Sequence, residues 1–110
     1  MLLSNLSKAI SVNKTYNFNK NKYFSAITSN SKFTNNKTLF IYDKNTKVKK
    51  IYLDEVLKSN TPAIISNKYI KNLKIPQFVV SNINFETYSL LNKLHNNLPF
   101  KTIAVTGTNG

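Results

Sequence analysis

The spacing of hydrophobic positions changes several times along the chain, and each change predicts a new element. Apolar runs at 38–42 and 63–66 predict two strands. Between them, residues 51–58 place apolar positions 52, 53, 56 and 57 on one side of a helix, which Pro62 ends. A strand, a helix and a strand within so short a span predict a parallel βαβ unit, and therefore an α/β fold.

The second half of the chain continues this alternation. Residues 77–81 predict a third strand, and Asn82 or Asn84 can cap a helix that continues through Leu94. The apolar side of this helix is predicted to contain Phe85, Tyr88, Leu91 and Leu94. A last apolar run at 102–105 predicts one more strand.

The first 25 residues differ from the rest in composition. Apolar residues recur at helical spacing at positions 2, 3, 6, 9 and 10, which predicts a short amphipathic helix that needs a core to pack on. The stretch 11–25 is polar and rich in Asn and Lys. We expect it to be an irregular loop without a function of its own.

Size and composition are those of one small domain. The chain has 110 residues and a hydrophobic share of 41%, enough for one modest core. It contains no cysteine, which excludes disulfides and thiolate zinc sites. The N-terminus lacks the features of a signal peptide, and no segment approaches the ~20 apolar residues of a membrane span. We therefore expect a monomeric cytoplasmic protein without a membrane partner.

The net charge of +12 favours a partner that carries phosphate. All 16 basic residues are Lys, which lacks the bidentate fork that reads base edges, so nucleic acid is the less favoured partner. A small basic nucleic-acid-binding module remains the alternative function from another class. Its candidate face consists of Lys44, Lys47, Lys49 and Lys50 beside Tyr42 and Tyr52. The four acids and His95 are too scattered to predict a metal site or a carboxylate pair, and His95 is expected at the surface.

Both glycines of the chain follow the predicted strand at 102–105. A turn that contains glycine after a strand lets backbone N–H groups bind phosphate oxygens. The candidate ATP-binding segment is therefore Thr106, Gly107, Thr108, Asn109 and Gly110. Taken alone, these residues favour an ordinary Asn-Gly turn over a phosphate site.

Several segments, taken in order, resemble the signatures of one enzyme family. Residues 26–32 and 39–41 resemble the T-x-D-S-R … G-x-L-F-x-A opening of the Mur ligases. Residues 52–65 resemble the F-x-x-x-A-x-x-x-G-A-x-A-x-x helix and strand of that family, and 105–110 match the start of its V-T-G-T-N-G-K-T-T loop. The chain is most similar to the ligases that add the third amino acid to UDP-MurNAc-L-Ala-D-Glu in peptidoglycan synthesis. The D-Ala-D-Ala-adding ligases, which usually have Ser in place of Thr108, are the second candidate.

The resemblance implies a division of the chain into three parts. Residues 1–25 would be a lead-in, 26–98 a UDP-substrate-binding domain with a βαβ core, and 99–110 the first strand of a truncated P-loop ATPase domain. ATP and Mg²⁺ would serve the complete enzyme, and neither is expected to bind stably here, because the sequence lacks the Lys of the loop. These 110 residues are therefore expected to be inactive alone. By position, UDP-MurNAc-L-Ala-D-Glu would contact Ser29, Ser31, Thr46, Lys47 and Val48. A turn that only caps a strand end is the alternative for the two serines.

The chain departs from the family pattern near these residues. Asn30 and Lys32 stand where the family usually has Asp and Arg, and Asn45 stands where it has Gly. Lys49 and Lys50 replace a D-G-H sequence. The added lysines either balance the charge of a diphosphate or form a solvated basic loop, and the sequence leaves both interpretations open.

Overall fold

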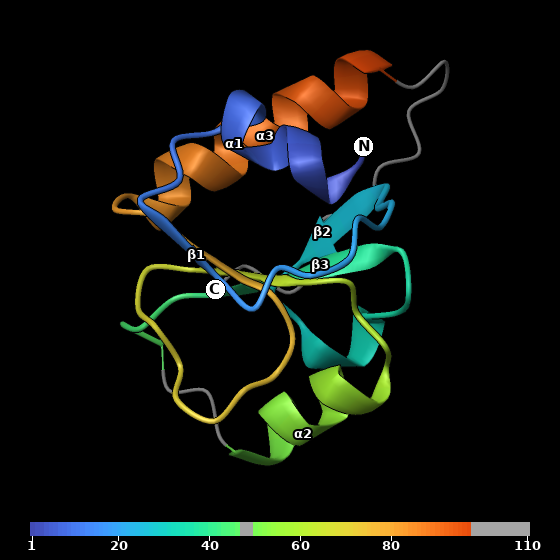
Figure 1. Ribbon diagram of the computed structural model, residues 1–110, viewed down its shortest axis with the longest axis vertical. Helices are drawn as coiled ribbons and strands as arrows, with labels where there is room; N and C mark the ends of the chain where they lie inside the picture. The colour runs from blue at the N-terminus through green and yellow to red at the C-terminus, as the bar shows by residue number, and fades with distance from the viewer. Residues whose placement is uncertain (47–49, 98–110) are drawn as a thin grey trace.

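Five strands form one sheet in the computed structural model, which describes residues 1–46 and 50–97 (Figure 1). The strand order is β1-β5-β4-β3-β2, in which β2 to β5 are parallel and β1 is antiparallel to β5. The strands are β1 (Lys14–Tyr16), β2 (Ala26–Thr28), β3 (Thr38–Tyr42), β4 (Ile64–Ser66) and β5 (Gln77–Val79). The predicted α/β class is confirmed.

Helices cover both faces of this sheet. The N-terminal segment and α3 lie on one face, and α2 lies on the other (Figure 1). The helices are η1 (Leu3–Asn5), α1 (Leu6–Ala9), η2 (Ser31–Phe33), α2 (Lys50–Lys58) and α3 (Ile83–Asn97). Within the described part of the chain, no helix is both long and apolar enough to cross a membrane.

The predicted βαβ unit is present as β3, α2 and β4. The two strands are parallel, with Phe40 opposite Ile64. The helix ends at Lys58, and Asn60 in the turn after it has a left-handed backbone (φ 62°) and an N–H that donates to the Leu57 carbonyl. The Thr61 hydroxyl then donates to the Thr38 carbonyl, which ties the start of β4 to the start of β3. These contacts fix the return of the chain from helix to strand.

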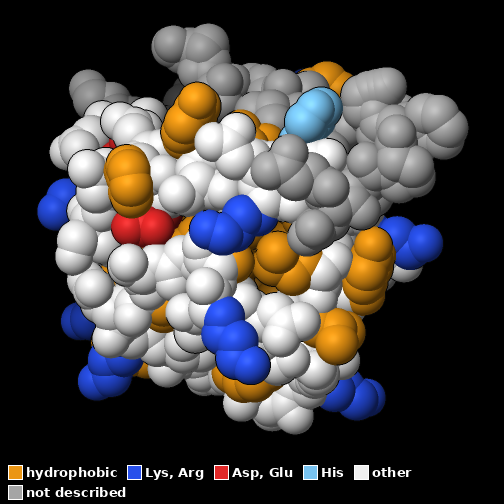
Figure 2. Space-filling model, turned by 90° about the horizontal axis from the view of Figure 1, so that it is seen from above, with side chains coloured by type: hydrophobic (Ala, Val, Ile, Leu, Met, Phe, Trp, Pro, Cys, Tyr) orange, Lys and Arg blue, Asp and Glu red, His pale blue; other side chains and the backbone are white. Residues whose placement is uncertain are grey.

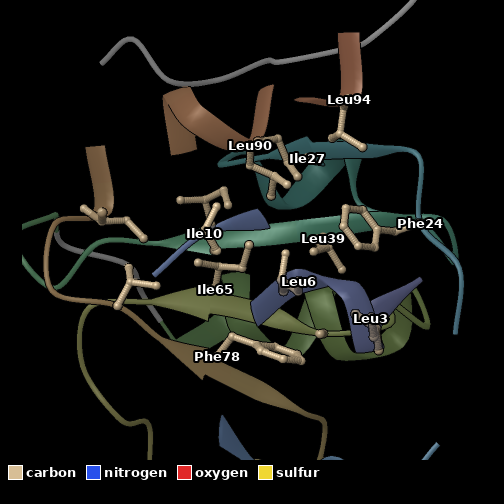
Figure 3. Packing of buried hydrophobic residues seen from close by; sticks show 14 residues of the cluster. Leu3, Leu6, Ile10, Phe24, Ile27, Leu39, Ile65, Phe78, Leu90 and Leu94 are labelled. Carbon is tan, nitrogen blue, oxygen red and sulfur yellow. The ribbon is translucent and has the colours of Figure 1, made fainter. Parts of the chain in front are cut away.

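The main hydrophobic core lies between the sheet and the helices α1 and α3 (Figure 3). Its buried members are Leu3, Leu6, Ile10, Phe24, Ile27, Leu39, Ile41, Ala63, Ile65, Phe78, Val80, Ile83, Leu90 and Leu94. The first three come from the N-terminal segment, so its predicted apolar side packs on the core, except for Leu2, which is 42% exposed. A smaller cluster on the α2 face consists of Phe40, Val56, Ile64 and Leu73.

The prediction of an irregular loop over 11–25 is wrong in part. Residues Lys14–Tyr16 form β1, which pairs antiparallel with β5 and places Thr15 opposite Phe78. Phe24 is fully buried in the main core. The strand was missed because three polar residues carry no alternation, and pairing with a segment about sixty residues later supplies the hydrogen bonds.

The predicted apolar side of α3 is also wrong in part. Phe85 and Tyr88 are 59% and 66% exposed, whereas Ile83 and Leu90 are buried with Leu94. The predicted residues and the buried ones both recur at helical spacing, so periodicity alone is compatible with either side of the helix. In the structure, the side that begins at Ile83 packs on the core. The polar residue in this stripe, Glu86, is buried and accepts a hydrogen bond from the Ser11 N–H (3.0 Å), which ties α3 to the segment after α1.

The predicted apolar side of α2 is only partly buried. Val56 is fully buried and Leu53 packs partly against the smaller cluster, but Tyr52 and Leu57 are exposed. The predicted strand at 102–105 lies outside the described residues.

Candidate functional site

The turns that follow the parallel strands meet at one edge of the sheet. Because β2, β3 and β4 run in the same direction, residues after Thr28, Tyr42 and Ser66 all lie at the carboxyl edge. Ligands of open α/β sheets bind outside this edge, where loops can enclose them without disturbing the core. The candidate site residues Ser29, Ser31 and Thr46 are in two of these turns.

The first turn follows β2 and is held by local hydrogen bonds. The Asn30 N–H donates to Thr28 Oγ1 (3.1 Å), and Asn30 Oδ1 accepts from the Lys32 N–H (2.9 Å), capping η2. Asn30 thus supplies a cap that Asp at this position would also supply. The Ser31 hydroxyl donates to Glu55 Oε1 on α2 (2.7 Å), and Ser31 is only 8% exposed.

The second turn follows β3 and is closed by Asp43. Its Oδ1 accepts from the Asn45 N–H (2.9 Å), and its carbonyl accepts from both the N–H (3.0 Å) and the hydroxyl (2.7 Å) of Thr46. Thr46 is exposed. A Gly at position 45 is therefore not required for a closed turn in this chain.

Asn67 joins the turns after β3 and β4. Its Nδ2 donates to Asp43 Oδ1 (3.0 Å), and its Oδ1 accepts from the Lys44 N–H (2.7 Å). Because one side chain holds both turns, they are fixed relative to each other, which a ligand that touches both would need.

A cleft of about 270 Å³ lies beside this junction, on the α2 face of the sheet. It is lined by Tyr42, Lys68, Tyr69, Ile70 and Lys71. Its wall is anchored by a buried side chain of β5. Gln77 donates through Nε2 to the Ile70 carbonyl and accepts through Oε1 from the Ile70 N–H, both at 2.9 Å.

Aromatic rings continue from the cleft toward β1. The rings of Tyr69 and Tyr16 have centroids 4.3 Å apart with a tilt of 35°. Lys14 Nζ lies 5.3 Å from the centroid of the Tyr16 ring, within the range of a cation–π contact. The strand that the sequence did not reveal thus supports one wall of the cleft.

Only some of the candidate site residues predicted from sequence lie in the described part of the chain. Ser29, Ser31 and Thr46 lie in neighbouring turns at the carboxyl edge, and the hydroxyls of Ser31 and Thr46 both donate hydrogen bonds within the protein. Lys47 and Val48 lie outside the described residues, as does the segment 106–110. Of the alternative basic face, Tyr42 lines the cleft and Tyr52 is exposed on α2.

In the view onto the face of α1 and α3, the lysine side chains of the described residues lie apart from one another instead of forming one patch (Figure 2). His95 is exposed, as predicted. Among the described residues, no group of three His, Cys, Asp or Glu side chains could hold a metal ion.

The cleft was not found by reasoning from sequence. Its residues come from β3 and from the loop between β4 and β5, for which the hydrophobic pattern predicted no element. A usable signal was present in the order Lys68-Tyr69-Ile70-Lys71, in which two cations flank an aromatic and an aliphatic residue. No protein-family model matches the chain, and no curated protein matches its sequence.

Proposed function

We propose that the carboxyl edge at β2 and β3 binds the UDP end of UDP-MurNAc-L-Ala-D-Glu, as part of an ATP-dependent ligase that adds the third amino acid to this precursor. One observation carries the proposal. The two turns that correspond to nucleotide-binding segments of the Mur ligases follow adjacent parallel strands, in which Thr28 is paired with Phe40. They are therefore neighbours at one edge, where one nucleotide can touch both.

The chemistry of the turns supports a uridine nucleotide. Ser29 and Thr46 carry short hydroxyls, whose oxygens can accept a hydrogen bond from a pyrimidine N–H. The Thr46 hydroxyl keeps this capacity although it donates to the Asp43 carbonyl. Ser31 is assigned a positioning role, because its hydroxyl already donates to Glu55 and so holds the first turn against α2. The excess of Lys over acidic residues favours an anionic ligand.

The proposed binding domain includes more of the chain than the resemblance implied. Residues of the N-terminal segment share one core with residues of β2 to β5 and α3. The segment 106–110 would contribute to binding ATP and Mg²⁺ only in the complete ligase, and stable binding of either to these 110 residues is not expected. The D-Ala-D-Ala-adding ligases remain the second candidate within the family.

Calorimetric titration with UDP-MurNAc-L-Ala-D-Glu tests the proposal. We expect saturable binding, with a preference for this ligand over ADP-glucose. Replacing Ser29 or Thr46 with Ala should raise Kd about three- to tenfold, the value of one hydrogen bond. Ser7→Ala, an exposed position on α1, is the matched control and should leave Kd unchanged. Absence of binding, or equal binding of ADP-glucose, would overturn the proposal.

A further inference from the structure

The cleft beside the two turns combines two kinds of group that recognise a nucleotide. Lys68 and Lys71 place two cationic side chains on its lining, and Tyr42 and Tyr69 supply aromatic surface. Tyr69 is 39% exposed although its ring packs on Tyr16, so part of it is accessible to a ligand. None of the described residues that line the cleft is acidic.

We propose that this cleft binds a nucleoside diphosphate, with the diphosphate on Lys68 and Lys71 and the ring of the ligand against Tyr69. Assigning that diphosphate to UDP-MurNAc-L-Ala-D-Glu rests on the proposed function. The pairing of cationic and aromatic groups rests only on the residues of the cleft. Lys is suited to this role, because a point charge satisfies a diphosphate in many orientations.

The walls of the cleft are held before any ligand arrives. Both backbone polar groups of Ile70 pair with the buried Gln77 side chain, and Asn17 Nδ2 donates to the Leu73 carbonyl (2.8 Å) farther along the same loop. Asn67 fixes the start of the loop to the turn after β3. A loop tied at three points loses little conformational freedom when a ligand binds.

Size and surroundings favour a single nucleotide over an extended strand. A volume of about 270 Å³ is near the lower end of small-ligand pockets, which suits one diphosphate and one ring. The Tyr69 ring already packs on Tyr16, so it has one side left to offer a ligand. Asp43 follows the cleft residue Tyr42 in sequence, and its carboxylate accepts hydrogen bonds from the Asn45 N–H and from Asn67 Nδ2. These hydrogen bonds offset part of the repulsion between this carboxylate and a phosphate.

Binding of UDP, uridine and pyrophosphate to the full chain separates the two contributions. We expect the double substitution K68Q/K71Q to weaken UDP and pyrophosphate binding about tenfold at low salt, and to leave uridine binding unchanged. Tyr69→Leu should weaken UDP and uridine binding, and leave pyrophosphate binding unchanged. K8Q/K93Q changes two exposed lysines of α1 and α3 and is the charge-matched control. Thermal melting checks that each variant is folded.

The outcomes distinguish this inference from the proposed function. If UDP binds K68Q/K71Q as it binds the unmodified chain, the cleft assignment is wrong, and loss of UDP-MurNAc-L-Ala-D-Glu binding in Ser29→Ala would still support the proposed function. If the lysines control UDP and ADP binding equally and UDP-MurNAc-L-Ala-D-Glu has no advantage, the cleft assignment is supported and the proposed function fails. Tighter binding of a ten-residue oligothymidylate than of UDP, lost in K68Q/K71Q, would overturn the inference in favour of single-stranded nucleic acid.

Discussion

The two faces of the sheet are built in different ways. The face covered by α1 and α3 carries a cluster of 14 buried hydrophobic residues, drawn from the N-terminal segment, the strands and α3. The α2 face has a cluster of four, Phe40, Val56, Ile64 and Leu73. On that face, hydrogen bonds from Gln77, Asn67 and Asn17 hold a loop over the strands.

The difference suggests that one face mainly stabilises the fold and the other mainly positions polar groups. Burial of apolar surface is strong and non-directional, so one face can stabilise the sheet without fixing any polar group in a particular orientation. Hydrogen bonds are weaker in net terms, but they fix the orientation of the groups they join. The face with the smaller hydrophobic cluster is the one that contains the cleft. We therefore expect substitutions on the first face to change stability most, and substitutions on the second face to change binding as well.

The largest effect is expected from Phe24→Ala in the main core. Phe24 is fully buried, and removing such a ring costs about 3–5 kcal/mol of unfolding free energy. Urea denaturation followed by circular dichroism measures the change. Phe33→Ala removes the same ring from a position that is 55% exposed and should cost about 0.5 kcal/mol or less. Similar losses for the two variants would contradict the placement of Phe24 in the core.

A smaller loss is expected from Gln77→Ala on the opposite face. The substitution leaves the N–H and carbonyl of Ile70 without their side-chain partner, which costs about 1–3 kcal/mol. Hydrogen exchange gives a specific readout, because the Ile70 amide should exchange much faster while the Leu39 amide in the sheet stays protected. An unchanged Ile70 exchange rate would show that other contacts hold the loop.

Asn60 tests how the end of α2 is specified. Its left-handed backbone costs a residue with a Cβ atom about 1 kcal/mol, a cost that Gly avoids and Asn reduces. Asn60→Ala should therefore lower the unfolding free energy by about 1 kcal/mol, and Asn60→Gly should leave it nearly unchanged. Thermal melting of the pair measures the difference. Equal stability of the two variants would mean that the turn relaxes to another conformation.

The smallest effect is expected on the outer side of α3. Phe85→Ser and Tyr88→Ser change side chains that are mostly exposed, so the unfolding free energy should change by about 0.5 kcal/mol or less. Leu90→Ala on the buried side of the same helix should cost about 2–5 kcal/mol. A large loss of unfolding free energy for Phe85→Ser would show that the side of α3 predicted from sequence is the buried one.

Local patterns predicted the elements that are stabilised locally. The βαβ unit was predicted because its strands are apolar runs and Pro62 marks the end of its helix. β1 was missed because its pairing partner is far away in sequence, and nothing in Lys14–Tyr16 reveals that partner. The buried side of α3 could not be chosen from periodicity, because two apolar stripes competed and only contact with the core decided between them.

The candidate site was predictable to a similar extent. The turn at Thr46 could be located because it follows the predicted strand at 38–42, now β3. The strand before Ser29, β2, was not predicted, and that turn was located by the resemblance of residues 26–32 to the Mur ligases. The use of the Ser31 hydroxyl by Glu55 depends on how η2 packs against α2, which spacing along the chain does not determine. The order Lys68-Tyr69-Ile70-Lys71 indicates cationic and aromatic groups, but the cleft also depends on the contact between Gln77 and Ile70, which the sequence does not reveal.

Synthesis proceeds from the N-terminus, so the antiparallel strand β1 is made well before the strand with which it pairs. β1 leaves the ribosome about sixty residues before its partner β5 exists, so it must wait through the assembly of β2, β3 and β4. Contacts of such long sequence separation form slowly, because the intervening chain must be closed into a loop first. The edge of the sheet that is made first is therefore completed last, and the Tyr16 wall of the cleft is completed with it.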